Sequence, residues 1–204
     1  MPDASHLTDA ERSVVTLTAP SGRAIEADVV RTGSGPRVVF LHGLVGLNEH
    51  WEDVVAKVRH RAECVTLEVP LLDLRGEDCS LWSVVQMTTQ YLDRHRDGPS
   101  ILVGNSFGGH VALRIAHSRP DLVRALVLAG SSGLIERTMV KGAPVRPSKD
   151  WLEEKIGELF YDKSNMNPGD VQRAHKLLNE RGGARAMVKL SKTARRDNMT
   201  DDLG

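Results

Sequence analysis

The sequence has few cysteines, few aromatic residues and no excess of either charge. Cys64 and Cys79 are too few for a disulfide framework, so we expect reduced thiols and a cytoplasmic protein. Lys and Arg total 27, as do Asp and Glu, which gives no electrostatic reason to expect nucleic-acid or membrane binding. No apolar run approaches the roughly 20 residues that span a bilayer. The polar start, residues 1–6, has no apolar core like that of a secretion signal.

Strand-like and helix-like segments alternate through the first 133 residues. Ser21-Gly22 predicts a hairpin turn between the first two strands. The later strands alternate with helices, which predicts an α/β fold with a doubly wound, mostly parallel sheet of about six strands. The predicted strands are 14–18, 24–30, 38–41, 64–69, 100–103 and 125–128. The predicted helices are about 48–59, with Trp51, Val54, Val55 and Val58 at helical spacing, 80–95, with Ser80 as its cap, and 110–116.

One short segment carries the strongest functional signal. Residues 104–109 read Gly-Asn-Ser-Phe-Gly-Gly, between a predicted strand and a predicted helix. A turn of this kind forces its serine into a strained conformation and exposes the hydroxyl at the carboxyl edge of the sheet. The glycines are needed because a side chain at their positions would collide across the turn. Ser106 is therefore a candidate nucleophile, and a plain helix N-cap hydroxyl is the alternative.

These residues resemble the N-terminal two thirds of an α/β-hydrolase. The likeness rests on Leu41-His42-Gly43 with the following Trp51, on the turn 104–109, and on residues 119–123 and 125–130. Within that superfamily, Gly-Asn-Ser-x-Gly-Gly is similar to the turn of the meta-cleavage-product hydrolases, which split carbon–carbon bonds, and of less specialised esterases. The resemblance implies a serine hydrolase of a small carbonyl substrate, an ester or an activated C–C bond, with no cofactor and no metal.

The resemblance implies an oxyanion hole beside Ser106. Its two donors would be backbone N–H groups, one from Phe107 and one from Leu44. These donors would hold the negative oxygen of the tetrahedral intermediate after Ser106 attacks the substrate carbonyl.

Further residues are expected to shape the site. By resemblance, His42 and Gly43 orient the oxyanion loop, so His42 is disfavoured as the base. Asn105 would hydrogen-bond a substrate carboxylate or the opposite loop, or else stabilise the turn. Trp51 would belong to the core or the pocket wall. His110 lies one helical turn after Ser106, and we expect it to point into packing.

After about Gly133 the alternation stops. By resemblance, residues 1–133 are the N-terminal part of the core, and residues 134–204 are a helical cap or lid over the substrate pocket; a plain helical appendage is the alternative. Arg173 and Arg185 would pair with an anionic substrate or lie on solvated helix faces. The predicted cap helices are 150–161, 168–181, with Asn167 as N-cap and Pro168 at its first position, and 184–196.

In this fold the serine is followed along the chain by an acid and then by a histidine. No strand pattern follows the last predicted helix, so we expect the triad acid and histidine beyond residue 204 and little activity from these residues alone. The strand 125–128 would then form an apolar edge prone to association, and a homo-oligomer is one outcome. The alternative is a non-catalytic ligand-binding or partner-dependent protein on a truncated hydrolase scaffold.

Overall fold

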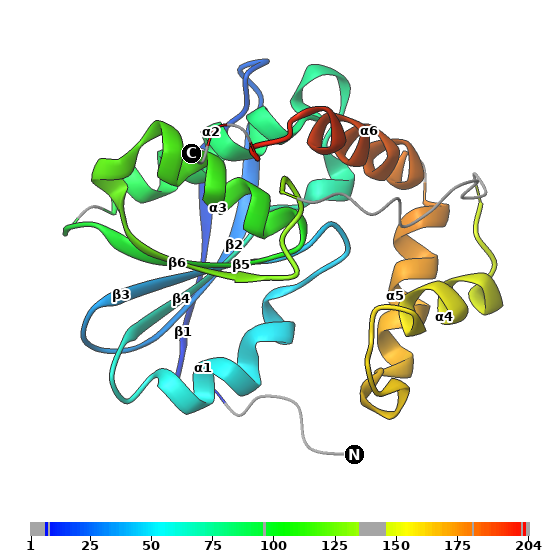
Figure 1. Cartoon of the computed structure of the whole chain (residues 1–204), viewed down its shortest axis with the longest axis horizontal. Helices are drawn as coiled ribbons and strands as arrows, with labels where there is room; N and C mark the ends of the chain where they lie inside the picture. Colours follow the sequence, from blue (N-terminus) through cyan, green and yellow to red (C-terminus); the bar gives the residue numbers. More distant parts are fainter. Residues whose placement is uncertain are drawn as a thin grey trace.

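The computed structural model describes residues 7, 9–95, 97–134, 146–180, 182–200 and 202. They form a six-stranded sheet with helices on both faces, and a further group of helices lies beside it (Figure 1). The predicted polar start lies outside the described residues. The predicted boundary after residue 133 falls next to residues 135–145, which also lie outside them.

The sheet has the predicted mostly parallel topology. Its order is β1-β2-β4-β3-β5-β6; β1 with β2 and β2 with β4 are antiparallel, and the other pairs are parallel. The predicted hairpin is confirmed by a 2.9 Å hydrogen bond from the Gly22 N–H to the Ala19 carbonyl. The strands are β1 (Glu11–Thr18), β2 (Ala24–Gly33), β3 (Arg37–Leu41), β4 (Glu63–Glu68), β5 (Ser100–Asn105) and β6 (Val123–Ala129).

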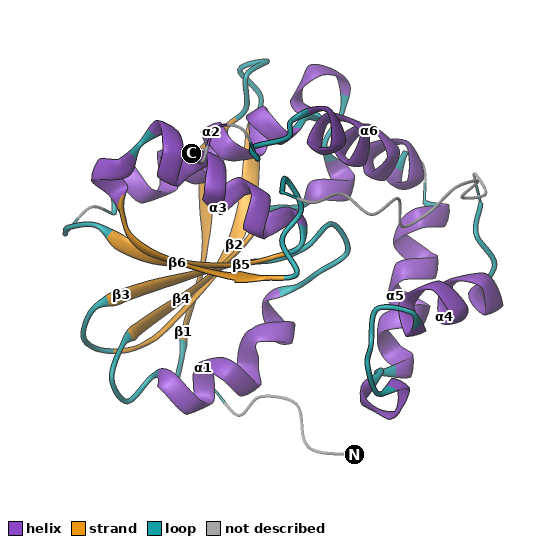
Figure 2. Ribbon diagram, viewed as in Figure 1, coloured by secondary structure: helices purple, strands orange, loops and turns teal. Residues whose placement is uncertain are grey.

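Helices cover the sheet unequally. Figure 2 shows α1 on one face and α2 and α3 on the other. None of the helices in the described part of the chain combines the length and apolar character needed to cross a bilayer. The helices are α1 (Glu52–Val58), α2 (Leu81–Arg94), α3 (Phe107–Ser118), α4 (Lys149–Gly157), α5 (Pro168–Asn179) and α6 (Gly183–Arg196). Short 3-10 turns are η1 (Asn48–Trp51), η2 (Leu71–Asp73), η3 (Gly76–Asp78), η4 (Pro120–Leu122) and η5 (Lys163–Asn165).

Local capping follows the predicted chemistry. The Ser80 hydroxyl accepts the Ser83 N–H at the start of α2, and the Asn167 side chain accepts the Gly169 N–H at the start of α5. Within the predicted helix 48–59, Val55 is buried, whereas Val54 is 43% exposed. The predicted helix begins as the 3-10 turn η1, whose three-residue period changes the phase before α1 starts.

Helix α6 joins the outer helices to the core. The Leu81 N–H at the start of α2 donates to the Thr193 hydroxyl at 3.0 Å, and the Lys189 ammonium donates to the Gly76 carbonyl at 2.9 Å. No strand lies among the described residues after β6. Strand β6 is the outer strand of the sheet and leaves Val127 half exposed.

Candidate functional site

Ser106 sits on a strained turn between β5 and α3. Its backbone has φ 51° and ψ −115°, and within the described residues no other non-glycine has a positive φ. Such a conformation costs about 1–3 kcal/mol and persists only where surrounding contacts hold it. Ser106 precedes α3 at the N-cap position, but its side chain makes no capping hydrogen bond. The N-cap alternative is therefore wrong, and the strained turn is confirmed.

Gly104 and Gly108 are required because other backbone atoms lie where a Cβ would be. A Cβ on Gly104 would lie 2.5 Å from the Gly108 carbonyl oxygen, and a Cβ on Gly108 would lie 2.2 Å from the Leu41 carbonyl oxygen. Real Cβ atoms do not approach so closely, so a side chain at either position requires the strand or helix to move. The predicted collision across the turn is confirmed for Gly104, whereas a side chain at Gly108 would collide with the end of β3.

The loop after β3 (residues 42–46, the oxyanion loop) lies against Ser106. The Cβ position of Gly43 is 3.4 Å from the Ser106 Cβ and 3.2 Å from the Asn105 Oδ1 atom. Within the described part of the chain, the backbone N–H groups of Leu44 and Phe107 have no hydrogen-bond acceptor. Both groups are therefore free to bind an anionic oxygen, and their role as the oxyanion hole stays a prediction.

His42 holds the oxyanion loop in place. Its Nδ1 atom lies 2.7 Å from the Gly43 carbonyl oxygen, and the ring is buried. Burial lowers the pKa of His42, although hydrogen bonds with the backbone at Gly43 and Val69 act in the opposite direction. The neutral ring therefore donates its Nδ1–H to the loop, which fits an orienting residue rather than a base.

Asn105 and Trp51 lie in different surroundings. The exposed Asn105 donates from Nδ2 to the Ala129 carbonyl at 3.1 Å, which supports the turn-stabilising alternative. Trp51 packs against Phe40, with ring centroids 5.2 Å apart, in the cluster on the α1 face of the sheet. Because Ser106 leads into α3 on the other face, the structure gives Trp51 a packing role and not a place beside the serine.

His110 is fully buried, as expected for a residue that points into packing. Its ring also has polar partners that the sequence analysis missed: Nε2 lies 3.0 Å from Asp197 Oδ1, and Nδ1 lies 3.4 Å from the Ser132 hydroxyl. His110 and Asp197 are 87 residues apart, so no local pattern could have revealed this contact.

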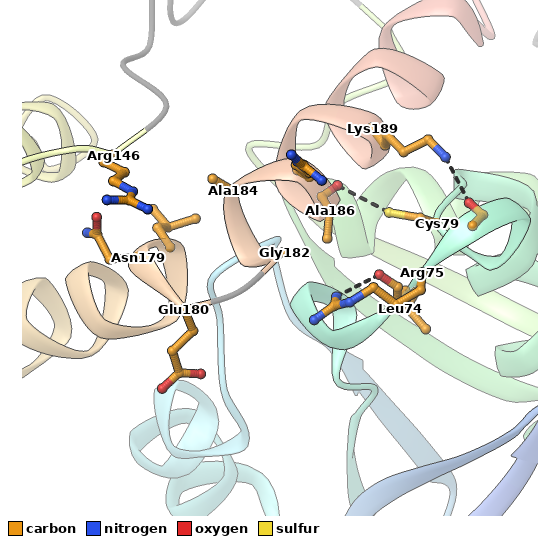
Figure 3. A pocket seen from close by; sticks show the side chains of 13 residues that line it. Leu74, Arg75, Cys79, Arg146, Asn179, Glu180, Gly182, Ala184, Ala186 and Lys189 are labelled. Carbon is orange, nitrogen blue, oxygen red and sulfur yellow. Dashed lines mark hydrogen bonds between the residues drawn. The ribbon is translucent and has the colours of Figure 1, made fainter.

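A cavity of about 730 Å³ opens where α6 meets the loop that contains η2 and η3 (Figure 3). Its floor is apolar, with Leu74 and Leu178 among the lining residues. In Figure 3 the Lys189 ammonium reaches the Gly76 carbonyl and the Arg75 guanidinium reaches nearby backbone oxygens. Four lining side chains are cationic and one is acidic: Arg75, Arg146, Arg185, Lys189 and Glu180.

The two arginines singled out from the sequence differ in their partners. Arg173 forms an ion pair with Asp170 and lies 3.7 Å from the Glu49 carboxylate, so its charge is already balanced. Asp170 also lies 3.3 Å from the His50 ring, and these contacts join α5 to η1. Arg185 lines the cavity, is exposed and has no ion-pair partner among the described residues, so both alternatives for this arginine stay predictions.

Ser106 has no visible base in this part of the protein. Among the described residues, no side chain hydrogen-bonds to the Ser106 hydroxyl. In the same residues, no group of three His, Cys, Asp or Glu side chains is arranged to hold a metal ion.

Comparison with known proteins identifies the architecture. A model of the alpha/beta hydrolase family matches residues 38–199. The chain is 34% identical over 126 residues to Lipase LipV of Mycobacterium tuberculosis, a match that covers 57% of this chain and 46% of LipV. It is 37% identical over 101 residues to a pimeloyl-[acyl-carrier protein] methyl ester esterase of Nitrosomonas europaea, covering 50% of this chain and 39% of the esterase. The matched stretch thus spans less than half of each relative.

A solved structure shows the same fold. The structure of a probable hydrolytic enzyme from Pseudomonas aeruginosa PAO1 superposes with a TM-score of 0.73 at 16% sequence identity. The superposition covers 95% of this chain and 69% of that one.

Proposed function

Because the chain belongs to the alpha/beta hydrolase family, we propose that it carries the nucleophile of a serine hydrolase that acts on small carbonyl substrates. The observation that carries the proposal is the strained Ser106, whose partly exposed side chain has no hydrogen-bond partner among the described residues and lies beside Gly43. Ser106 Oγ would attack the carbonyl of an ester while the base takes its proton. The acyl C–O bond would then break, and the alcohol would leave with that proton. Water would hydrolyse the acyl-enzyme to the carboxylic acid and free Ser106.

The Leu44 and Phe107 N–H groups would stabilise the oxyanion formed in each step. Each such donor contributes about 2.7–4 kcal/mol to the transition state. The helix that starts at Phe107 adds its N-terminal dipole to the same oxygen. A neutral serine needs a base, and the matched relatives are about twice as long as the matched stretch. We therefore place the triad acid and histidine in polypeptide beyond residue 204.

Ester cleavage is favoured over C–C cleavage, because the relatives matched by sequence are named as a lipase and an ester esterase. Four cationic side chains and one carboxylate line the cavity between α6 and the core, whereas Ser106, Leu44 and Phe107 do not line it. A place there for an anionic group of the substrate is therefore a separate proposal from the role of Ser106. The two free, buried thiols support a cytoplasmic location. A small molecule is the proposed partner, and assembly with further copies would occur along the exposed β6.

The experiment is active-site labelling of the full-length protein with a fluorophosphonate probe. We expect one label on Ser106, lost in Ser106→Ala together with ester hydrolysis. Ser118→Ala removes an exposed hydroxyl at the other end of α3 and is the matched control. This variant should retain both the label on Ser106 and ester hydrolysis. Failure of the probe to label Ser106 in a folded protein would favour the non-catalytic ligand-binding alternative.

A further inference from the structure

The carbonyl of Ser106 is held by two elements at once. It accepts the His110 N–H from α3 at 3.3 Å and the Ser132 N–H from the loop after β6 at 3.1 Å. The Ser132 hydroxyl lies 3.4 Å from the same carbonyl oxygen. Since Ser106 adopts a strained conformation, these contacts are what keep its hydroxyl in place.

The segment that follows α6 packs against both of these elements. We call residues 197–200 the return segment. The Met199 N–H donates to the Gly133 carbonyl at 2.7 Å, the Thr200 hydroxyl donates to the Leu134 carbonyl at 2.8 Å, and the Met199 side chain is fully buried. The return segment therefore covers the loop that contains Ser132.

Asp197 fixes the return segment to α3. Its carboxylate is 13% exposed and contacts two side chains of that helix, the buried His110 ring at 3.0 Å and the Arg114 guanidinium. The other side of Arg114 binds the Asp202 carboxylate at 2.8 Å. A buried carboxylate with two charged or polar partners is costly to disturb, because its removal leaves those partners unpaired.

The His110 ring transmits this contact toward Ser106. A Cβ on Gly133 would lie 2.5 Å from the ring, so the ring is packed tightly between Asp197 and the loop after β6. Because the Asp197 carboxylate is an acceptor, His110 Nε2 carries the proton of that hydrogen bond, and Nδ1 faces the Ser132 hydroxyl at 3.4 Å.

We propose that Asp197 is a positioning residue for Ser106: it ties the end of the cap to α3 and to the loop that holds the Ser106 carbonyl. Its carboxylate does not touch a substrate. The inference rests on the proposed role of Ser106 as nucleophile. The claim that Asp197 holds the backbone around Ser106 in place can be tested without an activity assay. Loss of the Asp197 contacts should increase local opening around Ser106 more than it increases opening of the central strands.

The test is amide hydrogen exchange on the full-length protein under native conditions. In Asp197→Ala, we expect the Ser132 and His110 amides to exchange at least tenfold faster, relative to amides of the central strands β3 and β5. Asp197→Asn keeps one acceptor oxygen and the side-chain volume, so we expect a smaller increase in the exchange rates of the Ser132 and His110 amides. This variant replaces Asp197→Ala in the test if the alanine variant does not fold. Asp93→Ala, which breaks an exposed contact with Arg119 at the far end of α3, should leave both amides unchanged.

If Asp197→Ala accelerates hydrogen exchange equally at the Ser132 and His110 amides and at the amides of β3 and β5, the proposal is wrong. Asp197 would then act on global stability alone. Unchanged exchange of the Ser132 and His110 amides would also overturn the proposal. An ester-hydrolysis arm adds a second readout: at equal folded fraction, Asp197→Ala should lower kcat at least tenfold, with partial recovery in Asp197→Asn. If Ser106→Ala keeps full activity, the proposed function fails, and the exchange result still decides whether Asp197 positions the turn.

Discussion

The sharpest prediction concerns Gly108, in the first turn of α3. A Cβ at this position would lie 2.2 Å from the Leu41 carbonyl oxygen and 2.6 Å from the His42 carbonyl oxygen. Both atoms belong to backbone, so no side chain can swing away, and α3 or the end of β3 must move. Overpacking of this kind costs roughly 1–3 kcal/mol, or more where only backbone can yield. Alanine is the better helix former by about 1 kcal/mol, which offsets part of the cost.

We therefore expect Gly108→Ala to lower the free energy of unfolding by about 2 kcal/mol. For a chain of this size, that corresponds to a fall in Tm of about 4–8 °C. Gly157→Ala is the matched control, because Gly157 is also helical and its Cβ would meet only the Lys163 side chain at 3.6 Å. It should leave the Tm unchanged or raise it slightly.

Calorimetric or urea unfolding of the two variants beside the parent measures both effects. The substitution should lower the Tm in α3 and should not lower it in α4. If Gly108→Ala is as stable as the parent, the close contact between α3 and β3 is absent, and with it the stated reason for glycine in this turn.

Three further predictions concern the site. Leu44→Pro removes the proposed donor and should lower kcat by about 10²–10³, whereas Leu44→Ala keeps the N–H and should lower it far less; similar losses would exclude a backbone role. The pKa of His42 is lowered by burial, so below about pH 6.5 the unfolded chain binds a proton that the folded chain does not. The free energy of unfolding should therefore fall between pH 7.5 and 5.5, and by less in His42→Asn; equal pH slopes in urea unfolding would contradict this. Arg185→Ala should lower kcat/KM for a carboxylate-bearing ester several-fold relative to its neutral counterpart, while Lys192→Ala, elsewhere on α6, should not; an unchanged ratio would remove the cavity from substrate binding.

The sequence predicted those features whose conformation is determined by residues close together along the chain. The serine turn followed from its glycine spacing, because the steric requirement is local. The Ser80 and Asn167 caps followed for the same reason. The mostly parallel sheet followed from the alternation of strands with helices, whereas the order of the strands within the sheet was not predicted. For Trp51 the sequence left the core and the pocket wall open, because periodicity alone does not distinguish the two, and the structure places it in a core cluster.

Contacts between distant segments could not be predicted in this way. Asp197 follows two arginines at the end of a helix, and nothing around it points to His110. The cationic cavity is likewise formed only when α6 meets η2 and η3. Both features depend on how the helical segment is placed on the sheet, and a single sequence does not contain that information.

The helices after β6 are attached to the sheet by two unlike sets of contacts. Around Asp197 the charges are buried and are little affected by dissolved salt. The pair α4–α5 reaches η1 through Arg173 and Glu49, whose charges face water and are screened within a Debye length of about 8 Å at physiological ionic strength. Rising salt should therefore weaken the contact of α5 with η1 before it weakens the contacts around Asp197.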